Sequence, residues 1–206
     1  MCTHSLSICG KSIIKKHSRF HNIQIIGGNW KRTPLVVHHL DGLRPTPNRA
    51  RETLFNWLGQ NLNGWRCLDL FSGTGALSFE AASRGASRVL MVECNPYAVQ
   101  QLYITKIKLR ANAVEIIKAD AFWLASKLMP HSFDLVFLDP PFSDVIALKR
   151  SLELVPSLVD QGGSIYVESN SKLELSRYNT LSGWYIVRDG RAGVVRYHLL
   201  RRENEK

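Results

Sequence analysis

The segment FDLVFLDPPF, residues 133–142, carries side chains that suit chemistry on a planar amine. A mostly apolar run leads to Asp139, and two prolines, Pro140 and Pro141, separate it from the aromatic Phe142. Proline fixes its φ angle and has no backbone N–H, so the local carbonyl groups are left as rigid acceptors. The Asp139 carboxylate and the Pro140 carbonyl can accept two hydrogen bonds from an amine whose ring stacks on Phe142. Alone, the segment also suits an ordinary Asp-Pro turn beside a core phenylalanine.

The segment LDLFSGTGALSFEA contains a glycine turn between a strand pattern and a helix pattern. Gly73 and Gly75 allow positive φ angles and a close approach of a ligand, and the first turn of a helix offers free N–H groups. Asp69 precedes this turn and can hold an ammonium group. Ser78 stands where a dinucleotide fingerprint has Gly or Ala, which disfavours a nicotinamide site.

Two more acids follow strand patterns farther along the chain. Glu93, in VLMVECNP, is placed to bind both hydroxyls of a ribose, as acids do in other nucleoside-binding α/β folds. Asp120, in IIKADAF, can accept a hydrogen bond from an adenine amine while the Ala121 N–H faces the ring. Either acid can instead cap a helix or lie at the surface. Their order after the glycine turn favours one nucleoside site.

The elements that must position these acids alternate between strands and helices from residue 65 onward. Strand patterns occupy residues 65–70, 88–92, 114–119, 133–139 and 163–168, and helix patterns occupy residues 76–83, 96–109, 122–127 and 145–155. This alternation predicts an α/β fold with a parallel sheet, right-handed connections and ligands at the carboxyl ends of the strands. Residues 183–200 predict a closing antiparallel hairpin.

A smaller unit precedes this fold. Residues 23–37 predict two short strands around Gly27 and Gly28, and a helix follows in which Thr46 can serve as the N-cap. The predicted division of the chain is a basic arm at residues 1–22, an RNA-binding hairpin and helix appendage at residues 23–64, and the main domain at residues 65–206.

The net charge of +10 is concentrated near the start of the chain. Residues 1–65 hold nine Lys and Arg against two acids, whereas the rest holds eighteen against fifteen. A basic arm beside a nearly balanced body predicts a polyanionic partner such as nucleic acid, with solubility as the alternative. The first 22 residues contain no acid, as in a transit peptide, but they run into the next segment without a cleavage-like pattern, which favours an arm.

Other classes of protein are disfavoured by composition. The four cysteines form no C-x-x-C pair, which favours a reducing compartment, the cytoplasm. No apolar run reaches the roughly 20 residues of a membrane span. No cluster of His, Cys and Asp has metal-ligand spacing, so we expect no metal. Nothing in the sequence indicates an obligate dimer, and we expect a monomer.

Four motifs together resemble one enzyme family. In their order and spacing, they resemble the RsmD family of 16S ribosomal RNA guanine-N2 methyltransferases, which are class I S-adenosylmethionine-dependent enzymes. The four segments are IIGGNWKRTPL, RPTPNRARETLFNWL, LDLFSGTGALSFEAASRGA and VFLDPPF. The resemblance spans about residues 23–202. It implies a Rossmann-like fold with a mostly parallel seven-stranded sheet, S-adenosylmethionine as cofactor, and 16S rRNA in the small subunit or its assembly intermediate as partner. The chain departs from the family pattern at WKRTP and Ala50, away from the expected chemistry.

The resemblance also implies residue roles. The cofactor would contact Asp69, Ser72, Gly73 and Gly75 through its methionine part, Glu93 through its ribose, and Asp120 and Ala121 through its adenine. The target guanine would contact Asp139, Pro140 and Phe142. Family-like residues that contact RNA backbone or flank the pocket would be Arg44, Thr46, Arg49 and Arg51, with a plain helix surface as the alternative. Charge adds phosphate contacts from Lys15, Lys16, Arg19, Lys31 and Arg32.

Other functions remain open from the residues alone. A different amino methyltransferase, acting on another RNA, on DNA or on a protein glutamine, can use the same acid-Pro-Pro-aromatic pattern. The chain has no room for a large DNA-recognition domain, however. A non-catalytic RNA-binding or ribosome-assembly protein is the alternative from another class, and a nicotinamide dehydrogenase is a more distant one.

Overall fold

The computed structural model describes residues 23–35, 46–142 and 144–203. Its centre is a seven-stranded sheet with the strand order β5-β4-β3-β6-β7-β9-β8. The strands are β3 (Arg66–Asp69), β4 (Arg88–Glu93), β5 (Val114–Lys118), β6 (Phe133–Leu138), β7 (Val159–Ser169), β8 (Trp184–Ala192) and β9 (Val195–Arg202). Strands β3 to β7 are parallel, and β9 and β8 add an antiparallel hairpin. This confirms the predicted α/β fold and its closing hairpin.

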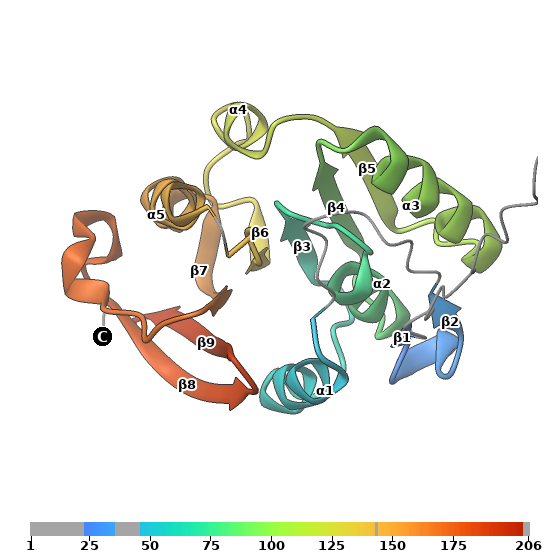
Figure 1. Cartoon of the computed structure of the whole chain (residues 1–206), viewed down its shortest axis with the longest axis horizontal. Helices are drawn as coiled ribbons and strands as arrows, with labels where there is room; N and C mark the ends of the chain where they lie inside the picture. Colours follow the sequence, from blue (N-terminus) through green and yellow to red (C-terminus); the bar gives the residue numbers. More distant parts are fainter. Residues whose placement is uncertain (1–22, 36–45, 143, 204–206) are drawn as a thin grey trace, which may run out of the picture.

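Helices cover both faces of the sheet, which gives three layers (Figure 1). One core joins α1 (Asn48–Trp57), α2 (Ala76–Ser83) and α3 (Pro96–Leu109) to one face, and a second core joins α4 (Ala121–Ala125) and α5 (Val145–Leu154) to the other. Short 3-10 turns follow at η2 (Val155–Ser157), η3 (Leu175–Arg177) and η4 (Asn179–Leu181). Because both faces are covered, the central strands are nearly continuous apolar runs.

The chain reverses its direction of travel across the sheet between β3 and β6. From β3 it moves outward through β4 and β5, and from β6 it moves the other way through β7. Loops that leave the carboxyl ends of β3 and β6 therefore diverge and leave a crevice between them. In open α/β sheets, this reversal is where ligands bind.

The described part of the appendage packs onto the main domain through apolar contacts. Strands β1 (Ile23–Gln24) and β2 (Pro34–Leu35) form a separate antiparallel pair joined through η1 (Gly28–Trp30). Ile25 of this unit and Leu54 and Phe55 of α1 are fully buried, and they belong to the same core as Phe79 of α2. The appendage is thus continuous with the main core.

A buried carboxylate adds a polar connection. Glu80 of α2 is fully buried and accepts hydrogen bonds from the backbone N–H of Ile26 at 2.7 Å and of Gly27 at 2.8 Å. Two cations face the same carboxylate: Arg84 at 2.7 Å and Arg51 at 3.6 Å. A buried charge is tolerated only when it is paired in this way. Glu80 therefore joins the hairpin, α1 and α2 at one point.

The turn between β1 and β2 needs glycine for steric reasons. Gly28 has a φ of +72°, and a Cβ atom there would lie 1.9 Å from the carbonyl oxygen of Ser83. The Ser83 hydroxyl donates to the Gly27 carbonyl at 2.6 Å and accepts from the Trp30 N–H at 2.9 Å. The predicted glycine turn is therefore also a site of close contact with α2.

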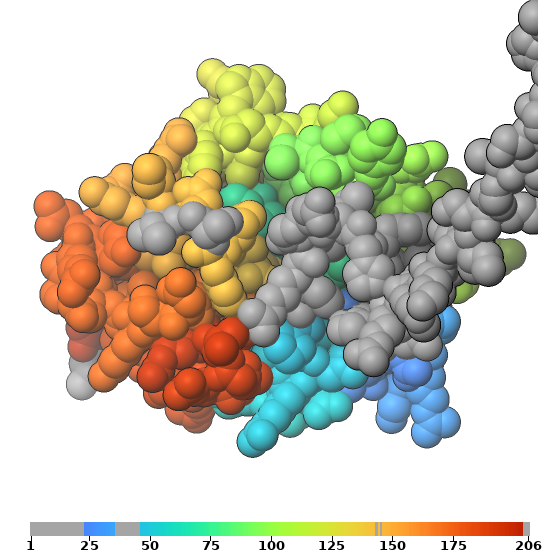
Figure 2. Space-filling view, viewed as in Figure 1, coloured from blue at the N-terminus to red at the C-terminus, as the bar shows by residue number. Residues whose placement is uncertain are grey.

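Helix α1 begins and ends differently from the prediction. Pro47 occupies its N-cap and no side chain caps it, so the predicted capping role of Thr46 is wrong. The helix ends at Trp57, whose ring centroid lies 5.5 Å from that of Tyr197 in β9. The end of the β8–β9 hairpin lies beside α1, as Figures 1 and 2 show. The hairpin and the appendage thus meet on one face of the molecule.

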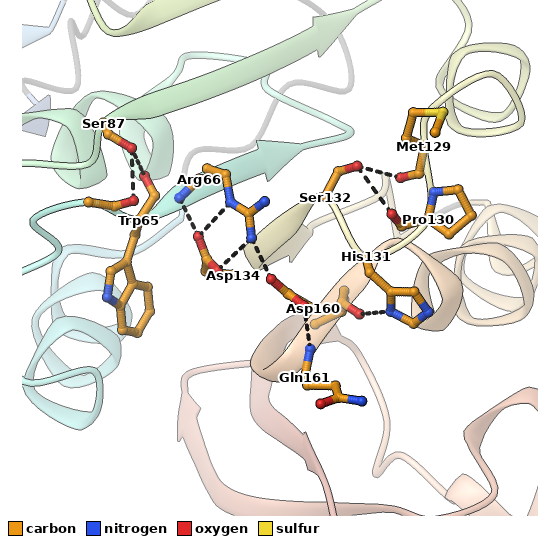
Figure 3. Close-up of polar contacts among 12 residues, drawn as sticks. Trp65, Arg66, Ser87, Met129, Pro130, His131, Ser132, Asp134, Asp160 and Gln161 are labelled. Carbon is orange, nitrogen blue, oxygen red and sulfur yellow. Dashed lines mark hydrogen bonds and ion pairs between the residues drawn. The ribbon is translucent and has the colours of Figure 1, made fainter.

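The amino ends of the central strands are joined by a surface ion-pair group (Figure 3). Arg66 in β3 contacts the carboxylates of Asp134 in β6 at 2.9 Å and Asp160 in β7 at 2.6 Å. All three side chains are more than a quarter exposed. This group lies at the opposite end of the strands from the crevice, so it contributes to sheet pairing and not to the site.

Candidate active site

A cavity of about 620 Å³ occupies the crevice at the carboxyl ends of the parallel strands. Its wall receives an acidic side chain from, or just after, each of the five strands: Asp69, Glu93, Asp120, Asp139 and Glu168. Apolar side chains such as Leu77 and Val92 line the rest. The volume lies in the range of small-molecule and cofactor sites. The four strand ends singled out in the sequence are therefore brought together.

The glycine turn forms one wall of the cavity, although its two glycines differ in role. Gly73 lines the cavity with a φ of +49°, and Ser72 lies beside it. Gly75, at φ +74°, is buried behind the wall, where a Cβ atom would lie 2.7 Å from side-chain atoms of Leu102 and Phe79. The predicted contact of Gly75 with the cofactor is thus not supported by its place in the structure. A glycine is needed at this position because the turn into α2 requires a positive φ angle and leaves no room for a Cβ atom.

Asp69 is a buried acid at the floor of this wall. Its side chain is 2% exposed, and its Oδ2 accepts a hydrogen bond from Ser78 Oγ at 2.6 Å. Burial raises the pKa of Asp69 to about 7, although the hydrogen bond from Ser78 opposes the shift. Among the residues that the structure describes, no ion pair is formed with Asp69, and a buried carboxyl group of this kind is suited to a ligand that brings a cation, such as an ammonium group.

Glu93 is held by two backbone donors. Its Oε2 accepts from the Gly73 N–H and its Oε1 from the Asn95 N–H, each at 2.8 Å. These contacts orient the carboxylate across the mouth of the glycine turn, and each oxygen can accept a further hydrogen bond. A pair of adjacent hydroxyl groups matches that geometry.

Asp120 lies across the cavity at the start of α4. Its Oδ1 accepts from the Trp123 N–H at 2.8 Å, so it caps the helix. The capping role that the sequence left open is therefore real. The adenine contact stays a prediction for Asp120 and for Ala121, which also lines the cavity.

The DPPF segment forms the opposite wall. Asp139 is half-buried, Pro140 is buried and Phe142 is half-buried, and all three line the cavity. The Thr46 hydroxyl, 6% exposed, donates to Asp139 Oδ2 at 3.2 Å. An acid, a rigid carbonyl-bearing segment and an aromatic ring thus face the same space as the glycine turn. The start of α1 completes this wall.

Glu168 of β7 is another acid in the wall, and it was not expected from the sequence. It is 2% exposed, and its Oε1 accepts a hydrogen bond from the Tyr166 hydroxyl at 2.8 Å. The signal was present in the segment IYVES, because this acid ends a strand as the other four do. It carries no Gly or Pro beside it, and it was therefore not singled out.

The predicted RNA-binding residues fall into three groups. Lys31, Arg32 and Arg49 are exposed, as RNA contact requires. Arg51 is fully buried against Glu80, so its predicted contact with RNA is wrong. Thr46 is buried and flanks the cavity, which is the second of the two roles expected for it. The remaining residues lie outside the described ranges: Lys15, Lys16, Arg19 and Arg44.

The described residues contain neither a metal-type cluster of side chains nor a membrane-spanning helix. Within residues 23–35, 46–142 and 144–203, no group of three or more His, Cys, Asp or Glu side chains is arranged to hold a metal ion. In the same ranges, no helix has the length and apolarity needed to cross a bilayer.

Comparison with known proteins gives a consistent result. The family model described as "Conserved hypothetical protein 95" matches residues 23–201. Proteins named "Ribosomal RNA small subunit methyltransferase D" are similar: that of Escherichia coli K12 is 39% identical, over 91% of this chain and 93% of its own length, and that of Haemophilus influenzae is 36% identical, over 86% and 92%. A solved Escherichia coli structure described as "Putative methyltransferase yhhF" superimposes with a TM-score of 0.75 at 32% identity, covering 88% of this chain and 98% of its own.

Proposed function

The chain belongs to the family described as Conserved hypothetical protein 95, as its resemblance to RsmD predicted, and on this premise we propose that it transfers a methyl group from S-adenosylmethionine to the exocyclic N2 of a guanine in 16S ribosomal RNA. The observation that supports this most is the shared cavity. Cofactor-type acids after β3, β4 and β5 face the Asp139–Phe142 segment across one space. Two relatives named as small-subunit rRNA methyltransferases, similar over most of the chain, support the substrate class.

The donor set of one half of the cavity fits the cofactor. Asp69, a buried acid whose pKa is raised to about 7, gains a counter-ion from the amino group of the methionine part. Glu93, held by two backbone N–H groups, accepts the two ribose hydroxyls. Asp120 and Ala121 border the adenine, and Ser72 and Gly73 border the methionine part. When bound, the cofactor supplies a methyl group on a sulfonium, which leaves as a neutral thioether.

The other half orients the amine that accepts the methyl group. The N2 lone pair of guanine is delocalised into the ring, so the free amine is a weak nucleophile. Asp139 and the Pro140 carbonyl accept its two hydrogens, which favours a pyramidal nitrogen with its lone pair directed at the methyl group. Phe142 stacks on the base. As the N–C bond forms, one N2 proton is lost to Asp139 or to water.

Alignment is the main contribution of the protein to the rate. Holding two reactants in line supplies up to about 7–11 kcal/mol of the barrier in well-oriented cases. The Asp139 carboxylate also stabilises positive charge that develops on the nitrogen. Thr46 Oγ, which donates to Asp139 at 3.2 Å, keeps one oxygen of that carboxylate in place.

The RNA is held outside the cavity by basic residues. A base must leave its stack to reach the pocket, and phosphate contacts position the strand without reading its sequence. Lys31, Arg32 and Arg49 are exposed and available for this role. We place the reaction in the cytoplasm, on the small subunit or an assembly intermediate. One chain suffices, because its own residues line both halves of the cavity.

Replacement of Asp139 by alanine tests the mechanism. We expect Asp139→Ala to bind the cofactor by calorimetry like the wild type and to lose methyl transfer to small-subunit RNA by at least about a hundredfold. Asp134→Ala, at the far end of the same strand, is the matched control and keeps full activity. Full activity of Asp139→Ala would remove this carboxylate from the mechanism.

The substrate is tested by mapping methylated guanines in 16S RNA from cells with and without the gene. Loss of one N2-methylguanine in the deletion, restored by the purified protein, is the expected result. Labelling of DNA or protein instead would support a different amino methyltransferase. An unchanged modification map together with tight binding to RNA would support a non-catalytic assembly protein.

A further inference from the structure

Glu168 lies beside the amine-binding segment at the carboxyl end of the sheet. Strands β6 and β7 are paired in parallel with Leu138 opposite Val167, so the next residue of each chain segment, Asp139 and Glu168, lies at the carboxyl end of the two neighbouring strands. Both line the cavity. Two acids from adjacent strand ends therefore border the half of the cavity assigned to the target base.

The carboxylate of Glu168 is held by a buried tyrosine. Tyr166 is fully buried, and its hydroxyl donates to Glu168 Oε1 at 2.8 Å. Burial and the charge of Glu168 raise the pKa of Tyr166 well above its ordinary value, so the hydroxyl keeps its proton and remains a donor. The Tyr166 ring packs between Phe137 and Tyr197, at centroid distances of 6.3 and 6.4 Å. The acid is thus fixed by the core and does not depend on a mobile loop.

The chemistry of the bases gives such an acid a specific use. Guanine carries a ring N–H, at N1, directly beside its exocyclic amine. Adenine and cytosine carry a ring acceptor beside theirs, and uracil has a ring N–H without an amine. An acceptor placed next to the site that holds the amine therefore matches guanine alone among the four bases. Against adenine or cytosine, it would face a lone pair.

We propose that Glu168 selects guanine by accepting a hydrogen bond from its N1–H, while Asp139 and Pro140 hold its N2 amine. This rests on the proposed function, because it assigns the second contact of the same base. A site that is built to bind an N–H group discriminates strongly against a base that lacks it, because the carboxylate then faces a lone pair of that base. Glu168 is therefore a specificity residue, and Tyr166 positions it.

The test uses a base that keeps the amine and lacks the ring N–H. In 2-aminopurine, the 2-amino group is present and N1 is an acceptor. Small-subunit RNA carrying 2-aminopurine at the target position is compared with RNA carrying guanine, and each is offered to wild type and to Glu168→Gln. The amide of glutamine can donate to the N1 lone pair. Glu115→Gln, an exposed acid on β5 paired with Arg88, is the matched control.

We expect wild type and Glu115→Gln to methylate guanine at least about tenfold faster than 2-aminopurine, measured as kcat/KM, because one directed base contact discriminates by that order. In Glu168→Gln the ratio falls by at least about tenfold, through a lower rate on guanine and a higher relative rate on 2-aminopurine. The fluorescence of 2-aminopurine, which rises when the base leaves its stack, gives a second readout. Glu168→Gln should increase that signal on binding.

Three results would overturn the proposal. They are equal methylation of both bases by wild type, an unchanged ratio in Glu168→Gln, and loss of activity on both bases in a Glu168→Gln protein that still binds the cofactor by calorimetry. The first needs no variant, so it decides the matter even if Glu168→Gln does not fold. Failure of the proposed function looks different, because wild type would then methylate neither RNA.

Discussion

Replacement of Asp69 by asparagine should make the protein more stable and its cofactor binding weaker. The pKa of this buried carboxyl group rises from an ordinary 3.8 to about 7, because burial disfavours its charged form. The folded state therefore binds more protons than the unfolded state between those two values. The stabilising contribution of the neutral acid is complete below the lower value and is lost as the pH rises to about 7.

The size of the effect follows from the pKa change. One pKa unit corresponds to about 1.4 kcal/mol, so the wild type loses about 2 kcal/mol by about pH 5 and about 4 kcal/mol by about pH 8. Asparagine carries no charge to bury, and its oxygen can still accept from Ser78 Oγ. The free energy of unfolding of Asp69→Asn should thus exceed that of the wild type by an amount that grows by about 2 kcal/mol between those pH values.

Urea unfolding of the cofactor-free proteins at a series of pH values measures this difference. Asp120→Asn, at an exposed acid of the same cavity, is the control for the loss of a negative charge there. Calorimetry at about pH 8 should show Asp69→Asn binding the cofactor more than about tenfold more weakly, because the ammonium group loses its counter-ion. Parallel stability curves for the variant and the wild type would refute the reasoning. A stabilised variant with unchanged affinity for the cofactor would also refute it, because it would show that the buried charge of Asp69 does not bind the ligand.

Two further substitutions test how the site is supported. Gly75→Ala should lower the free energy of unfolding, measured in urea, by at least about 2 kcal/mol. The residue is in the left-handed region, and its new Cβ atom would meet Leu102 and Phe79 at 2.7 Å. Gly162→Ala is the control and should cost less, because its Cβ atom would meet no atom within 4 Å. Glu80→Gln should lower the free energy of unfolding by about 3 kcal/mol and speed proteolysis of the N-terminal hairpin, because it leaves the buried Arg84 without its carboxylate partner. Cleavage at the wild-type rate would contradict the role of Glu80 in joining the hairpin to α2.

The main architecture could be predicted from the sequence because the local signals agree with the fold. Apolar runs with alternating turn signals gave helices at 76–83 and 96–109 with the observed bounds, and strands at 88–92 and 133–139 to within one residue. The same periodicity indicated which strand ends meet. Strand β7 begins at Val159, earlier than the predicted 163, because the glycines at 162 and 163 look like a break while the chain continues through a shift in register.

The interior charges could not be predicted because long-range packing decides them. Arg51 lies in a segment rich in basic residues, and only the placement of α1 against α2 shows that it is buried with Glu80. The roles of Glu168 and Ser78 likewise depend on residues that are distant in the local sequence pattern. Thr46 looked like a helix cap locally, and its hydroxyl is used by Asp139, 93 positions later in the chain.

The reversal between β3 and β6 places the donor and the acceptor of the reaction in separate halves of the sheet. Residues assigned to the nucleoside follow β3, β4 and β5, and those assigned to the base follow β6 and β7. A chimera that exchanges the segment from 133 to 169 with that of a methyltransferase acting on another base should therefore change which base is modified and keep the affinity for the nucleoside. This division of the site between two halves of the sheet makes the fold suitable for directed evolution toward new RNA targets.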